Sequence, residues 1–277
     1  MPRERLTAIV TTFNEEGNIA DCLASLSFAD EILVVDSFST DKTVEIAVAF
    51  PKTRVLQHEY AGNGPQCNWA MDQAAHPWAL IVDADERVTP ALAREIADLL
   101  ERGTSADHYF LRRDNVFLDR VIRHSGWGQD RLVRLLRRGS ARYPEQLVHA
   151  DMHPEGPTPT LAAPLLHYTL RSLPQYVEKV HRYAEWGARD LARQGRTAGV
   201  VEVALRPAWR FFRMFILEAG FLDGLHGFLV CGLQSYGVFL KWARVWELRR
   251  LEKEGAAPRP LPPAGRGEGE NSRPLNW

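Results

Sequence analysis

The fold is decided by the stretch Trp78-Ala79-Leu80-Ile81-Val82-Asp83-Ala84-Asp85-Glu86-Arg87. Its apolar residues run without polar alternation into an Asp-Ala-Asp triplet, a pattern typical of a strand that is buried on both faces of a parallel sheet. Acidic residues that follow such a strand lie where open α/β sheets bind ligands. Two carboxylates one residue apart can share Mg²⁺, which binds proteins through one or two carboxylates together with substrate phosphates. On its own the triplet is a weak motif, and a solvated loop with incidental acids is the alternative.

The sequence upstream alternates strands and helices. Strands are expected at 6–12, 31–36 and 53–57, and helices at 19–26, 42–49 and 66–75. Strict alternation of this kind predicts an α/β fold with a mostly parallel central sheet flanked by helices. The strand ends then meet at one edge and bring together Asn14-Glu15, Asp36 and Asp83/Asp85. Acids from three neighbouring strand ends need a cation or a donor-rich ligand to offset their repulsion, and a nucleotide with a metal-bound diphosphate meets that need.

Four blocks in this order resemble family 2 glycosyltransferases of the Rossmann-like GT-A fold: TTFNEE, VVDSFSTD, NGPQCNWA and IVDADER. The resemblance implies a UDP-sugar donor and a Mg²⁺ or Mn²⁺ ion. It implies that the metal ligand is Asp85, with Asp83 and His149 as further candidates. It also implies a set of nucleotide-sugar-binding residues: Thr12, Asn14, Glu15, Asp36, Gln66, Asn68 and Asp83. The sequence departs from the family after the second strand, where Asp36-Ser37-Phe38-Ser39 replaces the frequent D-D-G-S pattern.

The middle of the chain is basic. Nine arginines stand against three acids between residues 112 and 142, which suits an anionic acceptor or the leaving diphosphate, with a solvated basic face as the alternative. Gly126-Trp127-Gly128-Gln129-Asp130 resembles the family's loop before the catalytic base, so we expect Asp130 to begin a helix and to deprotonate the acceptor, with Glu145 as runner-up. His149 lies in a block that resembles the family's V-H-E but lacks its Glu.

Bulk properties narrow the class of protein. The chain has 277 residues, a formal net charge of -1 and three widely spaced cysteines, so neither a nucleic-acid binder nor a disulfide framework is indicated. The first five residues lack the apolar core of a signal peptide, and we find no run of about 18 uncharged apolar residues. These features favour a cytoplasmic protein.

The last third is expected to be helical. Residues 171–254 interleave aromatic side chains with Arg and Lys, a pattern found in helices that lie on a membrane surface. The alternative is a pair of helices that pack on the catalytic domain or on another subunit. Residues 255–277 are rich in Pro and Gly and are expected to be disordered. The expected organisation is a GT-A catalytic domain at 1–170, with its nucleotide-sugar half at 1–103 and its acceptor half at 104–170, followed by the helical extension and the tail.

The leading hypothesis is an inverting glycosyltransferase. It resembles the subgroup that adds glucose to the inner-core heptose of lipopolysaccharide, which implies a lipid-linked and anionic saccharide acceptor. The resemblance places the protein peripherally on the inner face of the inner membrane. The alternatives are a nucleotidyltransferase that makes nucleotide sugars, and a non-catalytic, membrane-associated adaptor with the same fold. The first strand is followed by acids instead of a glycine-rich basic loop, which disfavours the nucleotidyltransferase, and a dehydrogenase is disfavoured because no G-x-G-x-x-G follows it. The oligomeric state is left open.

Overall fold

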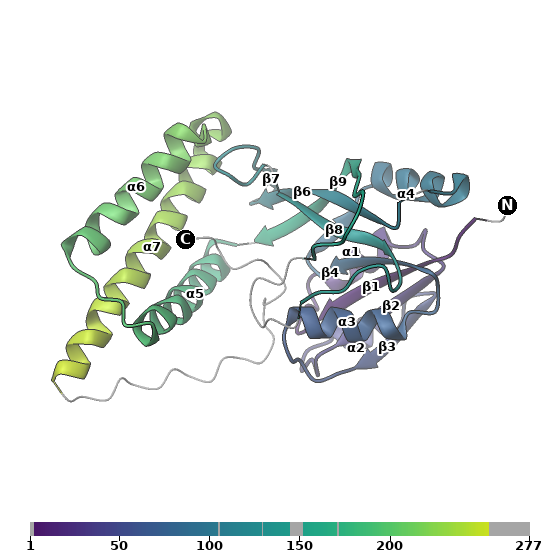
Figure 1. Ribbon diagram of the computed structural model, residues 1–277, viewed down its shortest axis with the longest axis horizontal. Helices are drawn as coiled ribbons and strands as arrows, with labels where there is room; N and C mark the ends of the chain where they lie inside the picture. Colours follow the sequence, from purple (N-terminus) through teal and green to yellow (C-terminus); the bar gives the residue numbers. More distant parts are fainter. Residues whose placement is uncertain (1–2, 105, 129, 145–151, 171, 255–277) are drawn as a thin grey trace. The chain divides into compact units, whose positions relative to one another are not determined.

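The structure, a computed structural model, describes residues 3–254 except 105, 129, 145–151 and 171 (Figure 1). Glu145, His149 and the tail 255–277, on which the sequence makes predictions, lie outside the described residues. The described chain forms two compact units. Unit 1 comprises residues 3–114 and 130–168, and unit 2 comprises residues 115–128 and 169–254.

Unit 1 is built on a sheet whose strand order is β3-β2-β1-β4-β8-β6-β9-β5, with β7 paired to β6. The strands are β1 Leu6–Thr12, β2 Glu31–Asp36, β3 Thr53–Gln57, β4 Trp78–Asp83, β5 Glu86–Val88, β6 His108–Phe117, β7 Arg120–Val121, β8 Asp130–Arg137 and β9 Thr160–Leu170. β1 pairs in parallel with both β2 and β4, and β2 pairs in parallel with β3. β8 then pairs antiparallel with β4 and β6. The α/β class, with a mostly parallel central sheet, is confirmed.

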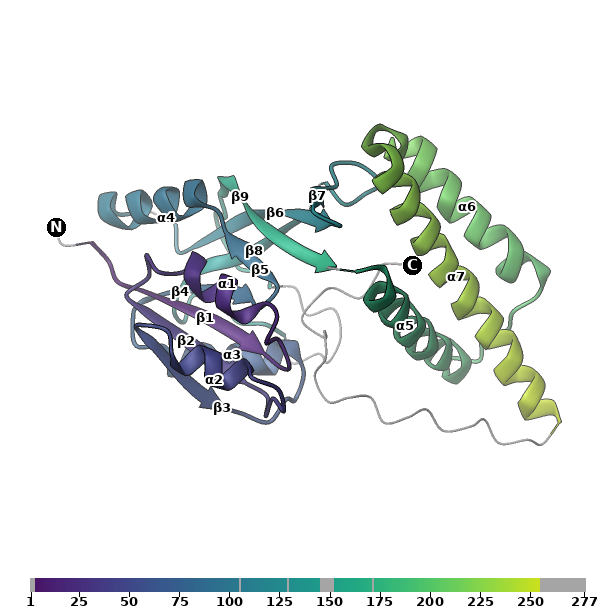
Figure 2. The ribbon, with the colours of Figure 1, turned by 180° about the vertical axis from the view of Figure 1, so that it is seen from behind.

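Helices cover both faces of the parallel strands. α1 Ile19–Ser25, α2 Thr43–Val48 and α4 Pro90–Arg102 pack on one face in a core that includes Val10, Val34 and Val82. α3 Asn63–Gln73 packs on the other face against Ile9, Leu33 and Ile81. Figure 1 shows α3 in front of the sheet, and Figure 2, seen from behind, shows α1 and α2 in front. Because successive side chains of a strand point to opposite faces, every residue of β1 and β4 is buried.

Local sequence sets both ends of α4, the helix that follows β5. Thr89 caps its start by accepting a hydrogen bond from the Leu92 backbone N–H at 3.2 Å, and Pro90 occupies the first turn. Gly103 follows its last turn at φ +74°, where a side chain would strain the backbone. One helix prediction is wrong: Asp130 begins β8 and not a helix. The apolar residues Leu132, Val133, Leu135 and Leu136 have a helical spacing, but in a strand they point to both faces of the sheet. The structure has a strand here, which pairs with β4 on one side and β6 on the other.

Unit 2 contains three long helical segments. α5 Leu173–Arg193 and α6 Arg206–Phe212 both pack against α7 Gly224–Lys253, and the π-helical turns Val201–Leu205 and Arg213–Leu217 flank α6. A 3-10 turn, Gly220–Asp223, precedes α7, so the expected C-terminal helical extension is present. No single helix in the described part of the chain is long and apolar enough to cross a bilayer. The segments Val201–Leu217 and Gly220–Lys253, bent by 72° at their junction, reach that length and composition only together.

Candidate functional site

The carboxyl ends of three parallel strands bring the predicted residues to one edge of the sheet. Thr12 of β1 stands opposite Asp36 of β2, and Thr11 stands opposite Asp83 of β4. Both aspartates are fully buried, and Thr12 is 3% exposed. The backbone therefore brings the ends of these three strands together, as the sequence predicts. The physical cause is the parallel register of β1 with both of its neighbours, β2 and β4.

Asp36 is held by the loop that follows it. Its Oδ2 accepts hydrogen bonds from the Ser39 backbone N–H at 3.0 Å and from Gln57 Nε2 at 3.1 Å, and its Oδ1 accepts one from the Ser39 hydroxyl. The Ser39 Oγ also accepts a hydrogen bond from the Asn14 backbone N–H at 2.9 Å. Asn14 has φ +52°, a region in which Asn is favoured among non-glycine residues. The polar loops after β1 and β2 thus brace each other around Asp36.

The remaining nucleotide candidates are engaged in structural contacts. Glu15 Oε2 accepts a hydrogen bond from Asn18 Nδ2 at 2.7 Å. Gln66, fully buried on α3, bonds Ser37 Oγ at 3.1 Å and His58 Nδ1 at 2.8 Å. Asn68 bonds both backbone groups of one residue, donating to the Tyr143 carbonyl and accepting from its N–H, each at 2.9 Å. Asn68 therefore anchors the segment after β8 to α3.

The Asp-Ala-Asp turn is fastened to the sheet by a buried arginine that sequence reasoning missed. Arg134 of β8 donates to Asp83 Oδ2 at 2.6 Å, and its Nη2 lies 3.6 Å from Glu86 Oε1. Glu86, fully buried at the start of β5, accepts a hydrogen bond from the Asp83 backbone N–H at 2.9 Å. Burial raises the pKa of Asp83 to about 6, although the nearby charge of Arg134 acts in the opposite direction. Burial lowers the pKa of Arg134, but its acidic partners Asp83 and Glu86 outweigh that effect, so its pKa lies well above its usual value.

A second arginine extends this network to Asp130. Arg113 of β6 lies 3.4 Å from Glu86 Oε1 and donates through Nε to Asp130 Oδ2 at 2.8 Å. The two arginines and three carboxylates alternate in charge from Asp83 to Asp130. Arg113 and Arg134 are two of the nine arginines of the basic segment, and both are buried in ion pairs. The solvated-face alternative is therefore wrong for these two. For Arg134 the available signal was an Arg between Val133 and Leu135 in an apolar run, and Arg113, which stands between Arg112 and Asp114, carried no such signal.

Asp85 differs from Asp83 in its surroundings. Its side chain is 17% exposed, and its Oδ2 lies 3.2 Å from Nε2 of His167 on β9. Asp83 is committed to Arg134, so the carboxylate with solvent access in the triplet is Asp85. Among the described residues, no three His, Cys, Asp or Glu side chains are grouped as a metal cage. A carboxylate with an adjacent imidazole nevertheless fits an ion that takes its other ligands from substrate phosphates and water.

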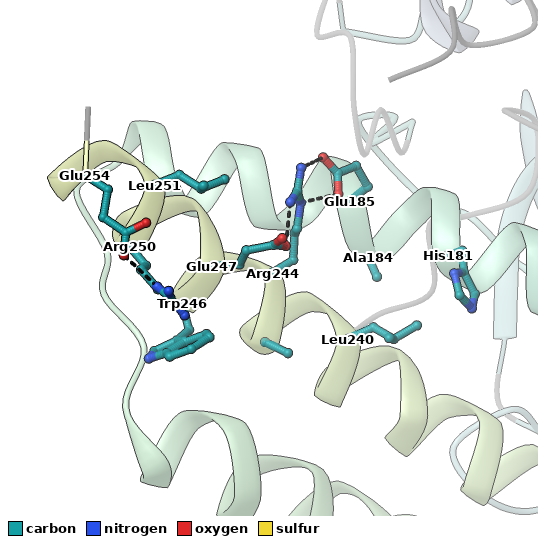
Figure 3. A pocket seen from close by; sticks show the side chains of 11 residues that line it. His181, Ala184, Glu185, Leu240, Arg244, Trp246, Glu247, Arg250, Leu251 and Glu254 are labelled. Atoms are coloured by element: carbon teal, nitrogen blue, oxygen red, sulfur yellow. Dashed lines mark hydrogen bonds and ion pairs between the residues drawn. The ribbon is translucent and has the colours of Figure 1, made fainter. Parts of the chain in front are cut away.

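A separate groove of about 550 Å³ lies in unit 2 between α5 and α7 (Figure 3). Its charged side chains pair with one another. Arg244 donates to Glu185 at 2.7 Å and to Glu247 at 2.5 Å, and Arg250 donates to Glu254 at 2.8 Å. The Arg244–Glu185 pair joins the two helices, and the other two pairs lie within α7 and its C-cap, so we assign the groove a structural role.

With this α/β fold and this edge of converging polar residues, the chain has the arrangement in which open α/β sheets bind ligands. It belongs to glycosyl transferase family 2, whose model matches residues 7–152, more than half of the chain. The lipopolysaccharide core biosynthesis glycosyltransferase LpsC of Rhizobium meliloti is 26% identical over 91% of this chain and 96% of its own length. An uncharacterized glycosyltransferase of Rickettsia bellii is 27% identical over 88% of this chain and 87% of its own. The solved structure of Staphylococcus aureus TarS 1–349 in complex with UDP-GlcNAc matches with a TM-score of 0.47 and 15% identity, over 92% of this chain and 93% of that one.

Proposed function

We propose that the protein transfers glucose from a UDP-sugar to a saccharide of the lipopolysaccharide inner core, with inversion at the anomeric carbon. The observation that carries the proposal is the parallel register that sets Thr12, Asp36 and Asp83 side by side, with Asp85 next in the chain and accessible to solvent. The core-biosynthesis name of the R. meliloti relative supports the acceptor class, since that similarity spans most of both chains. Family membership favours this hypothesis over a nucleotidyltransferase or a non-catalytic adaptor.

Asp85 and His167 are the residues that would hold Mg²⁺ or Mn²⁺. The bound ion would offset the charge that develops on the departing UDP. Arg134 forms an ion pair with Asp83, and Glu86 accepts a hydrogen bond from the Asp83 backbone N–H. These two contacts hold the turn in which Asp85 lies. Thr12, Asn14, Glu15, Asp36, Gln66 and Asn68 remain the proposed nucleotide-sugar residues. The brace around Asp36 and the anchor at Asn68 would shape that pocket more than they would donate to the ligand.

Asp130 is the proposed base. An in-line, inverting attack needs one group to take the proton from the acceptor hydroxyl, and a carboxylate at the start of β8 can do so. Its side chain is 11% exposed and is oriented by Arg113, which also bonds Glu86 of the Asp-Ala-Asp turn. The same network therefore positions the proposed base and the proposed donor-binding turn.

The proposed acceptor is lipid-linked and anionic, so the proposed working place of the enzyme is the cytoplasmic face of the inner membrane. Unit 2 would meet that surface, as the interleaved aromatic and basic residues of its helices suggest. Residues 1–170 are proposed as the catalytic part and residues 171–254 as the membrane-associating extension.

The test is the variant Asp85→Ala, with Asp98→Ala on the exposed surface of α4 as matched control. UDP release from UDP-glucose is measured on truncated core oligosaccharide, with Mn²⁺ and with EDTA. We expect Asp85→Ala to lose at least about 100-fold in rate, in the range of a lost transition-state electrostatic contact, while its thermal unfolding matches the control. Full activity of the variant in EDTA would remove the metal role, and no UDP release by the wild type from any nucleotide sugar would refute the transfer reaction.

A further inference from the structure

Exposed apolar side chains are concentrated in one part of unit 2. Of the large hydrophobic residues that are exposed in the described chain, fourteen of seventeen lie between Val200 and Trp246. Trp209 is 58% exposed, Leu217 60% and Leu225 68%. Soluble monomers rarely expose apolar residues so densely, and such patches mark sites of interaction with another molecule.

The helical segment around α6 carries three parallel stripes. Pro207, Phe211 and Met214 form the stripe that is buried or half-buried beneath it, with Phe211 and Met214 in a core shared with α7. One residue away, Arg206, Arg210 and Arg213 form a basic stripe. The third stripe is apolar and exposed: Leu205, Trp209, Phe212 and Ile216. A spacing of three or four residues keeps each stripe on one side of the helix.

The apolar stripe continues around the bend into α7. Leu217, Phe221, Leu222, Leu225 and Phe228 are all at least 49% exposed. Edge-to-face contacts hold this turn together, with ring centroids of Phe215 and Phe228 at 5.9 Å and of Phe215 and Phe221 at 6.3 Å. The close approach of Gly227 to the Gly220 carbonyl allows the two segments to meet there. The result is an ordered apolar ridge and not a set of loose side chains.

Cations gather beside this ridge. Lys241 of α7 has its pKa lowered to about 8 by burial and by the charges of Arg210 and Arg206. Burial likewise lowers the pKa of Arg210. The guanidinium of Arg206 lies 4.7 Å over the Trp242 ring, so it stays close to α7. Glu218 pairs with Arg213 at 2.8 Å, so the three arginines of the stripe and this one carboxylate together carry a formal charge of +2.

We propose that the face formed by Leu205, Trp209, Phe212 and Ile216, together with the arginine stripe 206, 210 and 213, docks on a bilayer surface rich in anionic headgroups. The apolar row enters the headgroup boundary while the arginines bind lipid phosphates. A second copy of the chain fits less well, because a twofold contact would set this arginine row against the same row of its partner. The inference deepens the proposed membrane partner, but its test needs neither donor nor acceptor.

The experiment is flotation of the full chain with vesicles of phosphatidylcholine alone and with about 30% phosphatidylglycerol. We expect binding to the anionic vesicles that weakens as salt increases. Trp209→Ser with Ile216→Ser should weaken it at least about ten-fold, and Arg206→Gln with Arg213→Gln about 25-fold, or about five-fold for each arginine. The controls are Val48→Ser, an exposed apolar residue of α2, and Arg102→Gln, an exposed arginine of α4. Both should bind as the wild type does.

Three results would overturn the proposal. The first is absence of wild-type binding to anionic vesicles. The second is equal binding to neutral vesicles that resists salt, which would indicate insertion of the bent helix pair. The third is a concentration-dependent dimer that the Trp209 and Ile216 variants abolish, which would make the face a contact between copies of the chain. If the variants lose vesicle binding but still release UDP at the wild-type rate, the face binds membrane and takes no part in the transfer reaction.

Discussion

Replacement of Arg134 by Met tests whether the buried network holds the Asp-Ala-Asp turn. The Arg134 side chain is 5% exposed, while the Asp83 and Glu86 side chains that it contacts at 2.6 and 3.6 Å are fully buried. The substitution removes one positive charge, so the negative charges of both buried carboxylates lose a neutralising partner. Breaking a buried ion pair from one side typically costs about 3–5 kcal/mol, because the remaining charge stays in a poorly solvated place.

Arg137→Met is the matched control on the same strand. Arg137 pairs with Glu4 at 2.8 Å and with Asp107 at 2.9 Å, but its side chain is 36% exposed, so water can replace both partners. An exposed pair contributes about 0–1 kcal/mol. The free energy of unfolding of both variants is measured in urea, with the transition of unit 1 followed by circular dichroism. Combining Arg134→Met with Asp83→Asn should restore part of the loss, since the unpaired charge is then removed.

The reasoning is refuted if Arg134→Met costs no more than Arg137→Met. A loss of several kcal/mol that the added Asp83→Asn does not reduce would show that Arg134 acts through packing and not through charge. If the loss is as large as expected, the Asp-Ala-Asp turn without its Arg134 contact should also bind UDP-glucose more weakly, measured by calorimetry at a temperature where the variant is folded.

Three further outcomes are expected. The lowered pKa of Lys241 means that the folded chain releases this proton near pH 8 while the unfolded chain holds it to about 10.5, so the free energy of unfolding should rise with pH across that window. Lys241→Met should be more stable near neutral pH and should lack this rise, and a persistent rise in urea titrations would contradict the assignment. Gly227→Ala should cost about 1–3 kcal/mol, because its Cβ would lie 1.9 Å from the Gly220 carbonyl oxygen. Gly232→Ala in the same helix meets nothing within 4 Å and should gain about 1 kcal/mol, so equal melting temperatures would disprove the close contact. Asp130→Asn should bind UDP-glucose in a thermal-shift assay but lose turnover; retained turnover would move the base elsewhere, with Glu145 the next candidate.

The three helices and four parallel strands of the first eighty-three residues were predictable, because their periodicity is local, whereas the short strand β5 at Glu86–Val88 was not predicted. β1, β2 and β4 are apolar runs without alternation, and both of their faces are buried as such runs predict. The meeting of Thr12, Asp36 and Asp83 at one edge follows from parallel pairing alone. β8 was mistaken for a helix, since Leu132, Val133, Leu135 and Leu136 have a helical spacing, while a strand buried on both faces also carries apolar residues without alternation. Pairing with the neighbouring strands makes this segment a strand.

The sequence by itself determined the class of fold, the order of its elements, the edge of the sheet that carries the acids, and the family to which the chain belongs. Only the tertiary structure decided which charged side chains form ion pairs with one another. Arg113 and Arg134 lie far along the chain from Glu86 and Asp83, and His167 lies farther still from Asp85. Periodicity reports which residues are buried, because burial follows from hydrophobicity residue by residue. Pairing of two buried charges depends on which distant strands become neighbours in the sheet, and the sequence of one strand alone does not name its neighbour.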